Sequence, residues 1–249
     1  MQPEISSKML REIDPLALNL VSGDRQVYYV SKRIIDIVLA IFAVLLFLPL
    51  MVLVAVLIKL DSPGPIFFRQ DRVSVRRRNY NNKTYWQRVT FRCYKFRTMV
   101  CNADPSLHKS YIKALISNDC ESMTALQGGN TQIRKLTHDP RVTHLGRILR
   151  KSSIDEIPQF INVIKGEMSL VGPRPAIPYE VEMYKPWHYR RLETKPGITG
   201  LWQVTARSTA DFDEIVKLDI QYIEQQSFWT DLKILMRTPL AVLFCKGAV

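Results

Sequence analysis

Two adjacent carboxylates, Asp155 and Glu156, are the residues of this 249-residue sequence with the clearest capacity for chemistry. They follow Arg147 and Arg150 at the predicted start of a helix, where backbone N–H groups and arginines can hold a phosphate and a divalent cation together. A carboxylate stabilised there stays ionised, as a nucleophile or a Mg²⁺ ligand must be. A structural alternative exists, because Ser153-x-x-Glu156 fits a capping box and acids are favoured in a first turn. Helix physics alone favours that alternative, whereas the neighbouring arginines favour a catalytic site.

A second candidate for phosphate binding is Arg174, which lies between Pro173 and Pro175. A guanidinium on such a stiff turn can bind a phosphate through two hydrogen bonds with little loss of freedom. An ordinary surface turn explains the same residues equally well. Gly197 and Gly200 also allow two interpretations, since they let the backbone approach a ligand or simply form a turn, and turns are the commoner case.

The elements that must position these residues are predicted from periodicity. Apolar residues recur at helical spacing over 139–166, which predicts two short amphipathic helices that meet at Ser152-Ser153. Val89 to Met99 alternates large apolar residues with cations, which predicts a strand with one solvent-exposed face. The basic stretch before it is predicted to be a loop, or a hairpin with Asn81-Asn82 at its turn.

Two further segments have weaker signals. Residues 101–133 are polar, and we expect a mobile insertion with a weak helical pattern over 106–117 and a loop at Gly128-Gly129-Asn130. The C-terminal stretch Phe228 to Phe244 is apolar with few charges. It either lies flat in a membrane interface, with Trp229 at the level of the headgroups, or forms an ordinary packed helix, and the sequence favours neither.

One apolar segment predicts a membrane partner. From Ile37 to Ile58, 22 residues, every side chain is apolar except Pro49. At ~1.5 Å per residue a helix of this length is about as long as the bilayer core is thick. Buried helices of soluble proteins seldom stay apolar on all faces for so long, and no signal-peptide cleavage site follows. We therefore expect this segment to insert into a membrane.

The residues alone do not decide whether the segment crosses the membrane or returns to the side from which it enters. Pro49 removes a backbone hydrogen bond near the middle of the segment and is expected to kink the helix. Cations stand on both flanks, including Lys32-Arg33 before it and Arg76-Arg77-Arg78 after it, whereas a single span should show them on one flank. These features suit a helix that enters and leaves on one face, but membranes also tolerate a kinked single span.

The overall charge agrees with an anionic partner. Lysine and arginine number 35 against 23 acids, a formal net charge of +12. Because an inserted helix flanked by cations meets anionic lipid headgroups, the membrane segment argues against nucleic acid as the explanation of this charge. The four cysteines and four histidines are scattered, so neither a zinc site nor a disulfide framework is indicated, and a chain facing the cytoplasm is the simplest interpretation.

Taken in order along the chain, these motifs resemble the bacterial sugar transferase family, the monotopic polyprenyl-phosphate phosphoglycosyl transferases. The resemblance covers about residues 31–245. The matching segments are 32–36 (KRIID) before the apolar run with Pro49, 64–70 (GPIFFRQ), 94–99 (YKFRTM), 149–159 (LRKSSIDEIPQ), 166–175 (GEMSLVGPRP) and 195–204 (KPGITGLWQV).

The resemblance implies a re-entrant membrane helix bent at Pro49 and a catalytic Asp-Glu pair. Asp155 is then expected to attack the β-phosphate of a UDP-sugar, UMP leaves, and a polyprenyl phosphate, usually undecaprenyl phosphate, takes the sugar phosphate from the enzyme. The family requires Mg²⁺, which Asp155 and Glu156 are expected to hold. This reaction begins the assembly of a surface glycan: an exopolysaccharide, a capsule, an O-antigen or a protein-linked glycan. Glucose, galactose and an N-acetylated amino sugar all remain open as the sugar.

On this basis we expect a mostly helical α+β protein at the bacterial inner membrane, with its catalytic domain on the cytoplasmic face. Residues 1–31 are predicted to be an arm, 32–60 the re-entrant helix, and 61–249 the membrane-associated catalytic domain with interfacial amphipathic helices. A homodimer is compatible with these expectations. Substrate phosphates are assigned to Arg147, Arg150 and Arg174, and the nucleotide or substrate loop to Gly197, Gly200, Gln203 and Arg207.

Some features depart from the family pattern. The sequence lacks the N-terminal bundle of membrane spans of the larger members, and it differs from the smallest members at 73–90 and 101–133.

Two other function classes compete with catalysis. A membrane-anchored nucleic-acid-binding protein would use the basic run at 76–78, but no recognisable reading element is present. A scaffold that lost activity is opposed by the intact Asp-Glu pair.

Overall fold

The computed structural model describes residues 26–80, 83–101, 104, 106–117, 119–126, 139, 141–206 and 210–243. Most of them are helical, and the strands form two small two-stranded sheets, which confirms the predicted α+β class with mostly helical content. Residues 1–25 of the predicted arm, the Gly128-Gly129-Asn130 loop and Arg207 lie outside the described residues.

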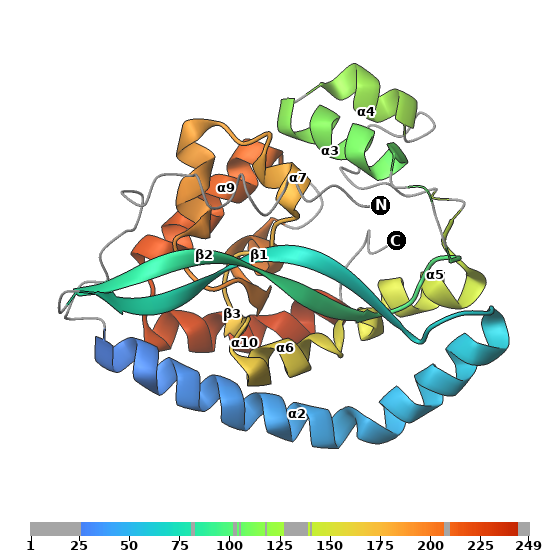
Figure 1. Cartoon of the computed structure of the whole chain (residues 1–249), viewed down its shortest axis with the longest axis horizontal. Helices are drawn as coiled ribbons and strands as arrows, with labels where there is room; N and C mark the ends of the chain where they lie inside the picture. The colour runs from blue at the N-terminus through green and yellow to red at the C-terminus, as the bar shows by residue number, and fades with distance from the viewer. Residues whose placement is uncertain are drawn as a thin grey trace.

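The longest element is helix α2 (Gln26–Asp61), which contains the predicted membrane segment. The helix was predicted to begin at residue 32. In the structure it includes Gln26 to Ser31, which were predicted to belong to the N-terminal arm. Pro49 lies inside the helix, and Figure 1 shows α2 as one curved helix beneath the rest of the molecule, with both ends rising toward it. Its buried residues are Asp36, Ala40, Val54 and Ile58, which follow one narrow stripe of a helix.

Above α2 lies a long hairpin of strands β1 (Phe67–Tyr80) and β2 (Lys83–Phe96). The strands are antiparallel, in register from Phe67 opposite Phe96 to Tyr80 opposite Lys83. Of the two predictions for the basic stretch, the hairpin is therefore correct, and the strand predicted from Val89 begins earlier, at Lys83. The pairing extends the strand because backbone hydrogen bonds, and not only the apolar alternation, define it.

The predicted amphipathic helices of 139–166 are present as helix α5 (His144–Lys151), the 3₁₀ turn η3 (Ile154–Glu156) and helix α6 (Gln159–Lys165). Helix α6 packs against α2 and β2. The short strands β3 (Ser169–Val171) and β4 (Gly197–Thr199) follow and pair in parallel. Together these elements surround the predicted catalytic residues.

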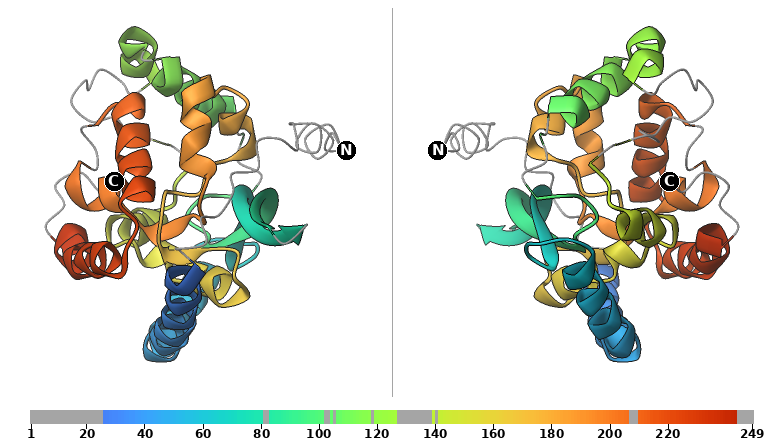
Figure 2. Two further views of the ribbon diagram at one scale, coloured as in Figure 1. Left: turned by 90° about the vertical axis from the view of Figure 1, so that its left-hand side faces the viewer. Right: turned by 90° about the vertical axis from the view of Figure 1, so that its right-hand side faces the viewer.

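The remaining described helices complete the domain. They are α3 (Ser106–Ser117), α4 (Cys120–Leu126), α7 (Pro178–Val181), η4 (Pro186–Leu192), α8 (Leu201–Thr205), α9 (Phe212–Glu224) and α10 (Phe228–Leu243). Helix α10 lies on the same side of the hairpin as α2 in Figure 1. Helix α3 confirms the weak helical pattern over 106–117. In both views of Figure 2, α3 and α4 stand at the end of the molecule opposite α2.

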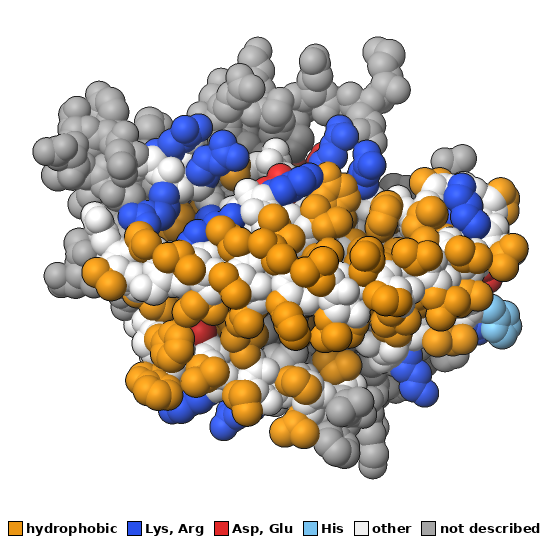
Figure 3. All heavy atoms as spheres, turned by 90° about the horizontal axis from the view of Figure 1, so that it is seen from below, with side chains coloured by type: hydrophobic (Ala, Val, Ile, Leu, Met, Phe, Trp, Pro, Cys, Tyr) orange, Lys and Arg blue, Asp and Glu red, His pale blue; other side chains and the backbone are white. Residues whose placement is uncertain are grey.

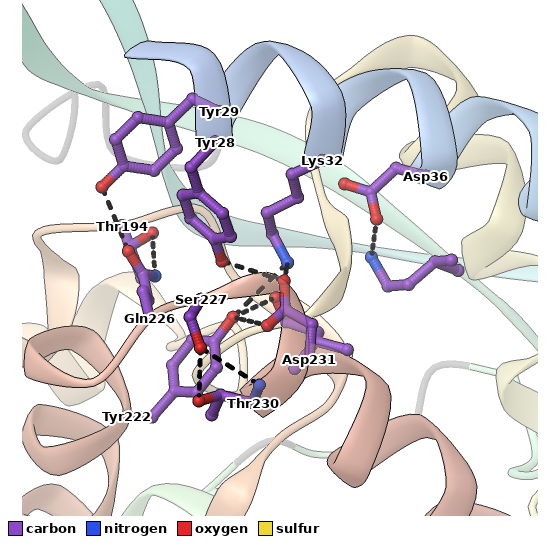
Figure 4. A network of polar contacts seen from close by, with 12 residues as sticks. Tyr28, Tyr29, Lys32, Asp36, Thr194, Tyr222, Gln226, Ser227, Thr230 and Asp231 are labelled. Carbon is purple, nitrogen blue, oxygen red and sulfur yellow. Dashed lines mark hydrogen bonds and ion pairs between the residues drawn. The ribbon is translucent and has the colours of Figure 1, made fainter. Parts of the chain in front are cut away.

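A buried polar network joins the start of α2 to α9 and α10 (Figure 4). Lys32 Nζ lies 2.6 Å from Asp231 Oδ2, and Tyr28 donates a hydrogen bond to the same oxygen at 2.9 Å. Tyr222, fully buried on α9, donates to Asp231 Oδ1 at 2.7 Å. Because every member of such a network has a partner, the network fixes the angle at which α2 leaves the domain.

The lower surface of the molecule is apolar. Exposed large apolar side chains follow α2 from Val27 to Leu60, and others on α10 include Trp229, Met236 and Leu240. Seen from below, apolar side chains cover this surface, and lysines and arginines gather along one edge of it (Figure 3). We call the exposed apolar surface of α2 and α10 the apolar face. A soluble protein rarely exposes so continuous an apolar surface.

Candidate active site

The two carboxylates of the predicted site stand in a sharp turn between α5 and α6. Helix α5 ends at Lys151, and Ser153 adopts a left-handed backbone conformation (φ 57°), the only positive φ among the described non-glycine residues. Such a conformation costs on the order of 1–3 kcal/mol and occurs often at functional sites. The chain then enters η3, in which Asp155 is buried and Glu156 is partly exposed.

The structure contradicts the capping-box alternative. The Ser153 side chain makes no capping hydrogen bond, and Glu156 belongs to a 3₁₀ turn. Glu156 Oε1 instead accepts a hydrogen bond from Lys95 Nζ at 2.6 Å. The acids at this turn are therefore not explained as a helix cap, which strengthens the catalytic interpretation.

Lys95, near the end of β2, faces both carboxylates. Its Nζ lies 2.6 Å from Glu156 Oε1 and 4.0 Å from Asp155 Oδ2. No role is predicted for Lys95 from the sequence, although it lies in the segment 94–99 that matches the family. Its signal was a cation within an alternating strand, and only the pairing of the strands shows which carboxylates it reaches.

Burial and the neighbouring charges shift the pKa values of the two carboxylates in opposite directions. Burial raises the pKa of Asp155 to about 6, against the opposing charge of Lys95 and with a contribution from the charge of Glu156. Burial also acts to raise the pKa of Glu156, but the positive charges of Lys95 and Arg174 outweigh it and lower this pKa to about 2. The site therefore favours the ionised form of Glu156 and disfavours that of Asp155, relative to free carboxyl groups.

A small pocket opens beside Glu156. Its lining comes from both strands of the hairpin, the η3–α6 turn, the segment after β3, β4 and α8: Arg72, Cys93, Lys95, Glu156, Gln159, Arg174, Pro175, Gly197, Ile198 and Gln203. Four of the predicted site residues, namely Glu156, Arg174, Gly197 and Gln203, thus meet at one pocket.

The turn that carries Arg174 is held from two sides. Gly197 N donates to Pro173 O at 2.8 Å, and Arg72 Nη1 donates to Pro175 O at 2.7 Å. The Arg174 side chain is exposed, and its charge acts on both Asp155 and Glu156. A free guanidinium on a fixed turn suits the binding of a substrate phosphate.

Arg72 is a second residue that sequence analysis missed. It is buried in the pocket wall, with hydrogen bonds to Pro175 O and to Gln70 Oε1, and its Nε has no hydrogen-bond partner within the described part of the chain. Burial lowers its pKa, and the charge of Arg174 adds to this effect. A buried, incompletely paired guanidinium beside the pocket favours an anionic ligand.

The other predicted phosphate ligands differ in position. Arg150 is half-buried, donates from Nε to Thr98 Oγ1 at 2.9 Å, and its charge acts on Asp155. Arg147 is exposed on α5 and is not among the main charges that act on either carboxylate. The structure therefore brings Arg150 to the Asp-Glu pair and does not bring Arg147 there.

The two predicted glycines serve backbone packing. A Cβ atom at Gly197 would collide with Gly172 N, and one at Gly200 would collide with Gly172 O, because the chain after β3 passes directly against β4. Gly197 also lines the pocket, so the turn interpretation and the ligand interpretation both apply to it. Gln203 lines the pocket as well, and its Nε2 donates to Ile198 O at 3.1 Å.

The donor set at the site is compatible with Mg²⁺. Among the described residues no group of three or more histidine, cysteine, aspartate or glutamate side chains could hold a metal. Mg²⁺ in proteins is usually bound by one or two carboxylates together with waters and substrate phosphates. Asp155 and Glu156 supply two adjacent carboxylates, of which Glu156 lines the pocket, so their chemistry fits this ion.

Comparison with known proteins bears directly on this site. One family, described as bacterial sugar transferase, matches residues 27–245 of the chain. The chain belongs to the bacterial sugar transferase family. The resemblance drawn from its motifs is thereby confirmed, and the transferase is an enzyme, as predicted.

Curated relatives match most of the transferase. It is 43 % identical over 222 residues to the galactosyl transferase CpsE of Streptococcus agalactiae, covering 89 % of the transferase and 44 % of CpsE. It is 38 % identical over 219 residues to the exopolysaccharide production protein ExoY of Sinorhizobium fredii, covering 88 % of each chain. It is 38 % identical over 217 residues to the undecaprenyl-phosphate galactose phosphotransferase of Salmonella typhimurium, covering 87 % of the transferase and 41 % of that protein. The transferase thus spans less than half the length of two of these relatives and most of ExoY.

Proposed function

We propose that this transferase moves a sugar-1-phosphate from a UDP-sugar to a polyprenyl phosphate, undecaprenyl phosphate by analogy with its relatives, and releases UMP. The observation that carries the proposal is the buried Asp155 next to Glu156, in a site where Lys95, Arg72 and Arg174 gather positive charge. Relatives are named as phosphotransferases for galactose, N-acetylgalactosamine and glucose-1-phosphate, and one as an exopolysaccharide production protein. Surface glycan assembly is the process that we propose for the transferase.

The proposed reaction has two displacements at one carboxylate. In the first, an Asp155 oxygen forms a bond to the β-phosphorus of the UDP-sugar, and the bond from that phosphorus to the bridging oxygen breaks. The electron pair leaves with UMP. In the second, an oxygen of the lipid phosphate attacks the same phosphorus, and the bond to Asp155 breaks, which restores the carboxylate. This scheme lets a soluble donor and a lipid acceptor use the same site in turn.

The residues around Asp155 have distinct parts in this scheme. Lys95 holds Glu156 and keeps positive charge next to the attacking carboxylate, and Arg174 and Arg72 face the phosphates. Phosphoryl transfer depends mainly on positioning and on charge neutralisation, which these cations supply. We propose that Asp155 and Glu156 also hold Mg²⁺, which when bound would neutralise charge on the diphosphate.

The apolar face supports membrane association. We propose that α2 enters the inner membrane and returns on the cytoplasmic face, with its bend at Pro49, and that α10 lies in the interface beside it. In support, both ends of α2 rise toward the rest of the molecule (Figure 1), and exposed apolar side chains continue from α2 onto α10. A lipid acceptor presents its phosphate at this surface, close to the catalytic residues.

A direct test of the function is a UMP-release assay with purified transferase, Mg²⁺ and undecaprenyl phosphate against a panel of UDP-sugars. We expect release with at least one of UDP-glucose, UDP-galactose and the UDP-linked N-acetylated amino sugars. The lipid product should carry one sugar and two phosphates. Absence of UMP with every donor would contradict the proposed function.

Topology gives a separate prediction. In a cysteine-free background, Leu20→Cys and Tyr85→Cys should both resist a membrane-impermeant thiol reagent in intact cells and react after the membrane is opened. The re-entrant path requires this, because both flanks of α2 then share the cytoplasmic side. Labelling at position 20 in intact cells would establish a single span instead. Pro49→Ala should convert some molecules to full crossing, since it removes the cause of the bend.

Arg174→Lys tests the phosphate contact. A lysine keeps the charge but cannot form the paired hydrogen bonds of a guanidinium, so kcat/KM should fall by about 5- to 150-fold, which corresponds to about 1–3 kcal/mol. The matched control is Arg190→Lys, a surface arginine on η4 paired with Glu224, which should leave kcat/KM unchanged. Equal kinetics in the two variants would mean that Arg174 is only a turn residue.

A further inference from the structure

Two cations converge beside the end of α6. Arg33 on α2 donates from Nη1 to Val163 O at 2.5 Å and from Nη2 to Ile164 O at 2.8 Å. A Cβ atom built on Gly166 would lie 3.2 Å from Arg33 Nη2 and 3.7 Å from Lys195 Nζ. The guanidinium of Arg33 and the ammonium of Lys195 therefore face the same small volume.

Within the part of the chain that the structure describes, the positive charge in this volume is compensated only in part, by the two carbonyls at the end of α6 that accept from Arg33. Burial, together with the positive charges of Arg33, Arg76 and Arg77, lowers the pKa of Lys195 to about 8, against the opposing effect of Asp36. Asp36 is itself engaged, because its Oδ1 accepts a hydrogen bond from Leu170 N at 3.0 Å. Among the described residues, no carboxylate is within ion-pair distance of any of the four cations. We call Arg33, Arg76, Arg77 and Lys195 the cation cluster.

The cation cluster borders the apolar face. The first turns of α2 expose Val27, Val30 and Ile34, so apolar surface begins next to Arg33. The guanidinium of Arg77 lies over the ring of Tyr29 at 5.6 Å, and Tyr29 packs edge-on against Trp86 at 5.3 Å. Figure 3 shows lysines and arginines along one edge of the apolar face. Trp86 is buried and holds the partly exposed Tyr29 in place, and a tyrosine beside cations at such an edge is typical of the level of lipid headgroups.

The cation cluster is separate from the reacting pocket. None of its four residues lines that pocket, and none is among the main charges that act on Asp155 or Glu156, which come from Lys95, Arg150, Arg174 and Arg72. An acceptor phosphate has to reach Asp155, so a phosphate bound at the cation cluster belongs to a different molecule. The nearest source of such phosphates is the bilayer itself.

We propose that the cation cluster binds the phosphate of an anionic phospholipid such as phosphatidylglycerol, and so fixes the N-terminal end of α2 at the membrane surface. The proposal rests on the membrane association proposed above and adds a defined lipid site to it. The apolar face alone would bind any bilayer, whereas this site makes binding depend on headgroup charge.

Vesicle flotation of the full chain tests the proposal. The wild type should bind phosphatidylcholine vesicles through the apolar face and bind more tightly to vesicles that also contain phosphatidylglycerol. Arg77→Gln with Lys195→Gln should lose about fivefold of that gain for each cation removed, because a cation near an anionic surface contributes about this factor. The matched control, Lys113→Gln with Lys217→Gln, removes the same charge from exposed positions on α3 and α9 and should keep the gain.

A second measurement does not depend on vesicle binding. In native mass spectrometry from neutral detergent, the wild type and the control should retain added phosphatidylglycerol, and the cluster variant should not. Equal retention by the cluster variant and the control would overturn the proposal, as would equal retention of phosphatidylcholine and phosphatidylglycerol by the wild type.

Two further outcomes separate this site from the proposed function. In the first, vesicles with polyprenyl phosphate in place of phosphatidylglycerol bind the transferase more tightly, this gain in binding depends on Arg77 and Lys195, and phosphatidylglycerol gives no gain. The site then serves the acceptor, and the proposal is wrong. If the wild type does not bind phosphatidylcholine vesicles, docking through the apolar face is wrong, and retention in detergent still decides the lipid site.

Discussion

Asp155→Asn is expected to abolish turnover and to abolish covalent labelling of the enzyme. Wild-type transferase supplied with Mg²⁺ and UDP-sugar but no lipid should release one burst of UMP and gain the mass of a sugar phosphate. The asparagine cannot form this bond. Its side chain has the same size, and because burial raises the pKa of Asp155, a neutral amide should be tolerated there with a Tm no lower than that of the wild type.

Glu156→Gln separates the two carboxylates. This variant keeps the shape of the side chain and should fold, but it should lose most turnover if Glu156 helps to hold Mg²⁺ and to orient Lys95. Mass spectrometry of the intact protein and a stopped assay for UMP measure both variants. Substantial turnover in Asp155→Asn, or a wild type without any adduct, would favour direct attack by the lipid phosphate in a ternary complex.

The second large effect is expected at Lys95. Lys95→Gln removes the only described cation within 4.0 Å of both carboxylates, so the burst rate of UMP release should fall by about 10²- to 10³-fold, the usual scale for one preorganised donor at a reacting centre. Two adjacent carboxylates without their cation repel each other and the incoming diphosphate.

The control and the rescue make this prediction specific. Lys151→Gln changes an exposed lysine at the end of α5 and should leave the burst unchanged. Lys95→Arg keeps the charge and should recover part of the rate. A burst in Lys95→Gln as fast as in the Lys151→Gln control would show that Lys95 serves only to stabilise the fold.

The periodicity of apolar residues was sufficient to predict the elements whose structure depends on local sequence. The apolar run of α2 is uninterrupted except at Pro49, and the pattern over 139–166 gave the helices on either side of Asp155. The start of α2 at Gln26 was missed because Tyr28, Tyr29 and Lys32 look polar in sequence, whereas their partners Gln226 and Asp231 are about two hundred residues away. No local pattern contains such contacts.

The same limit applies to the site. Asp155, Glu156 and Arg174 could be found because their types and neighbours are unusual within a short segment. Arg72 and Lys95 could not, since each is one of many cations in the hairpin and only strand pairing places them at the pocket. The capping-box alternative for Ser153 fitted the residue spacing, but the positive φ of Ser153 turns the chain away from a helix start.

One contact of α2 has a consequence for the depth of the catalytic pocket. Asp36, inside the apolar helix, accepts the amide hydrogen of Leu170 on β3, and the chain reaches the turn of Arg174 shortly after β3. With α2 in the bilayer, as proposed, this hydrogen bond sets a constant height of Arg174 above the lipid plane. The transferase should then work best in bilayers of one thickness, because a thicker or thinner bilayer would carry the acceptor phosphate above or below the level of the pocket.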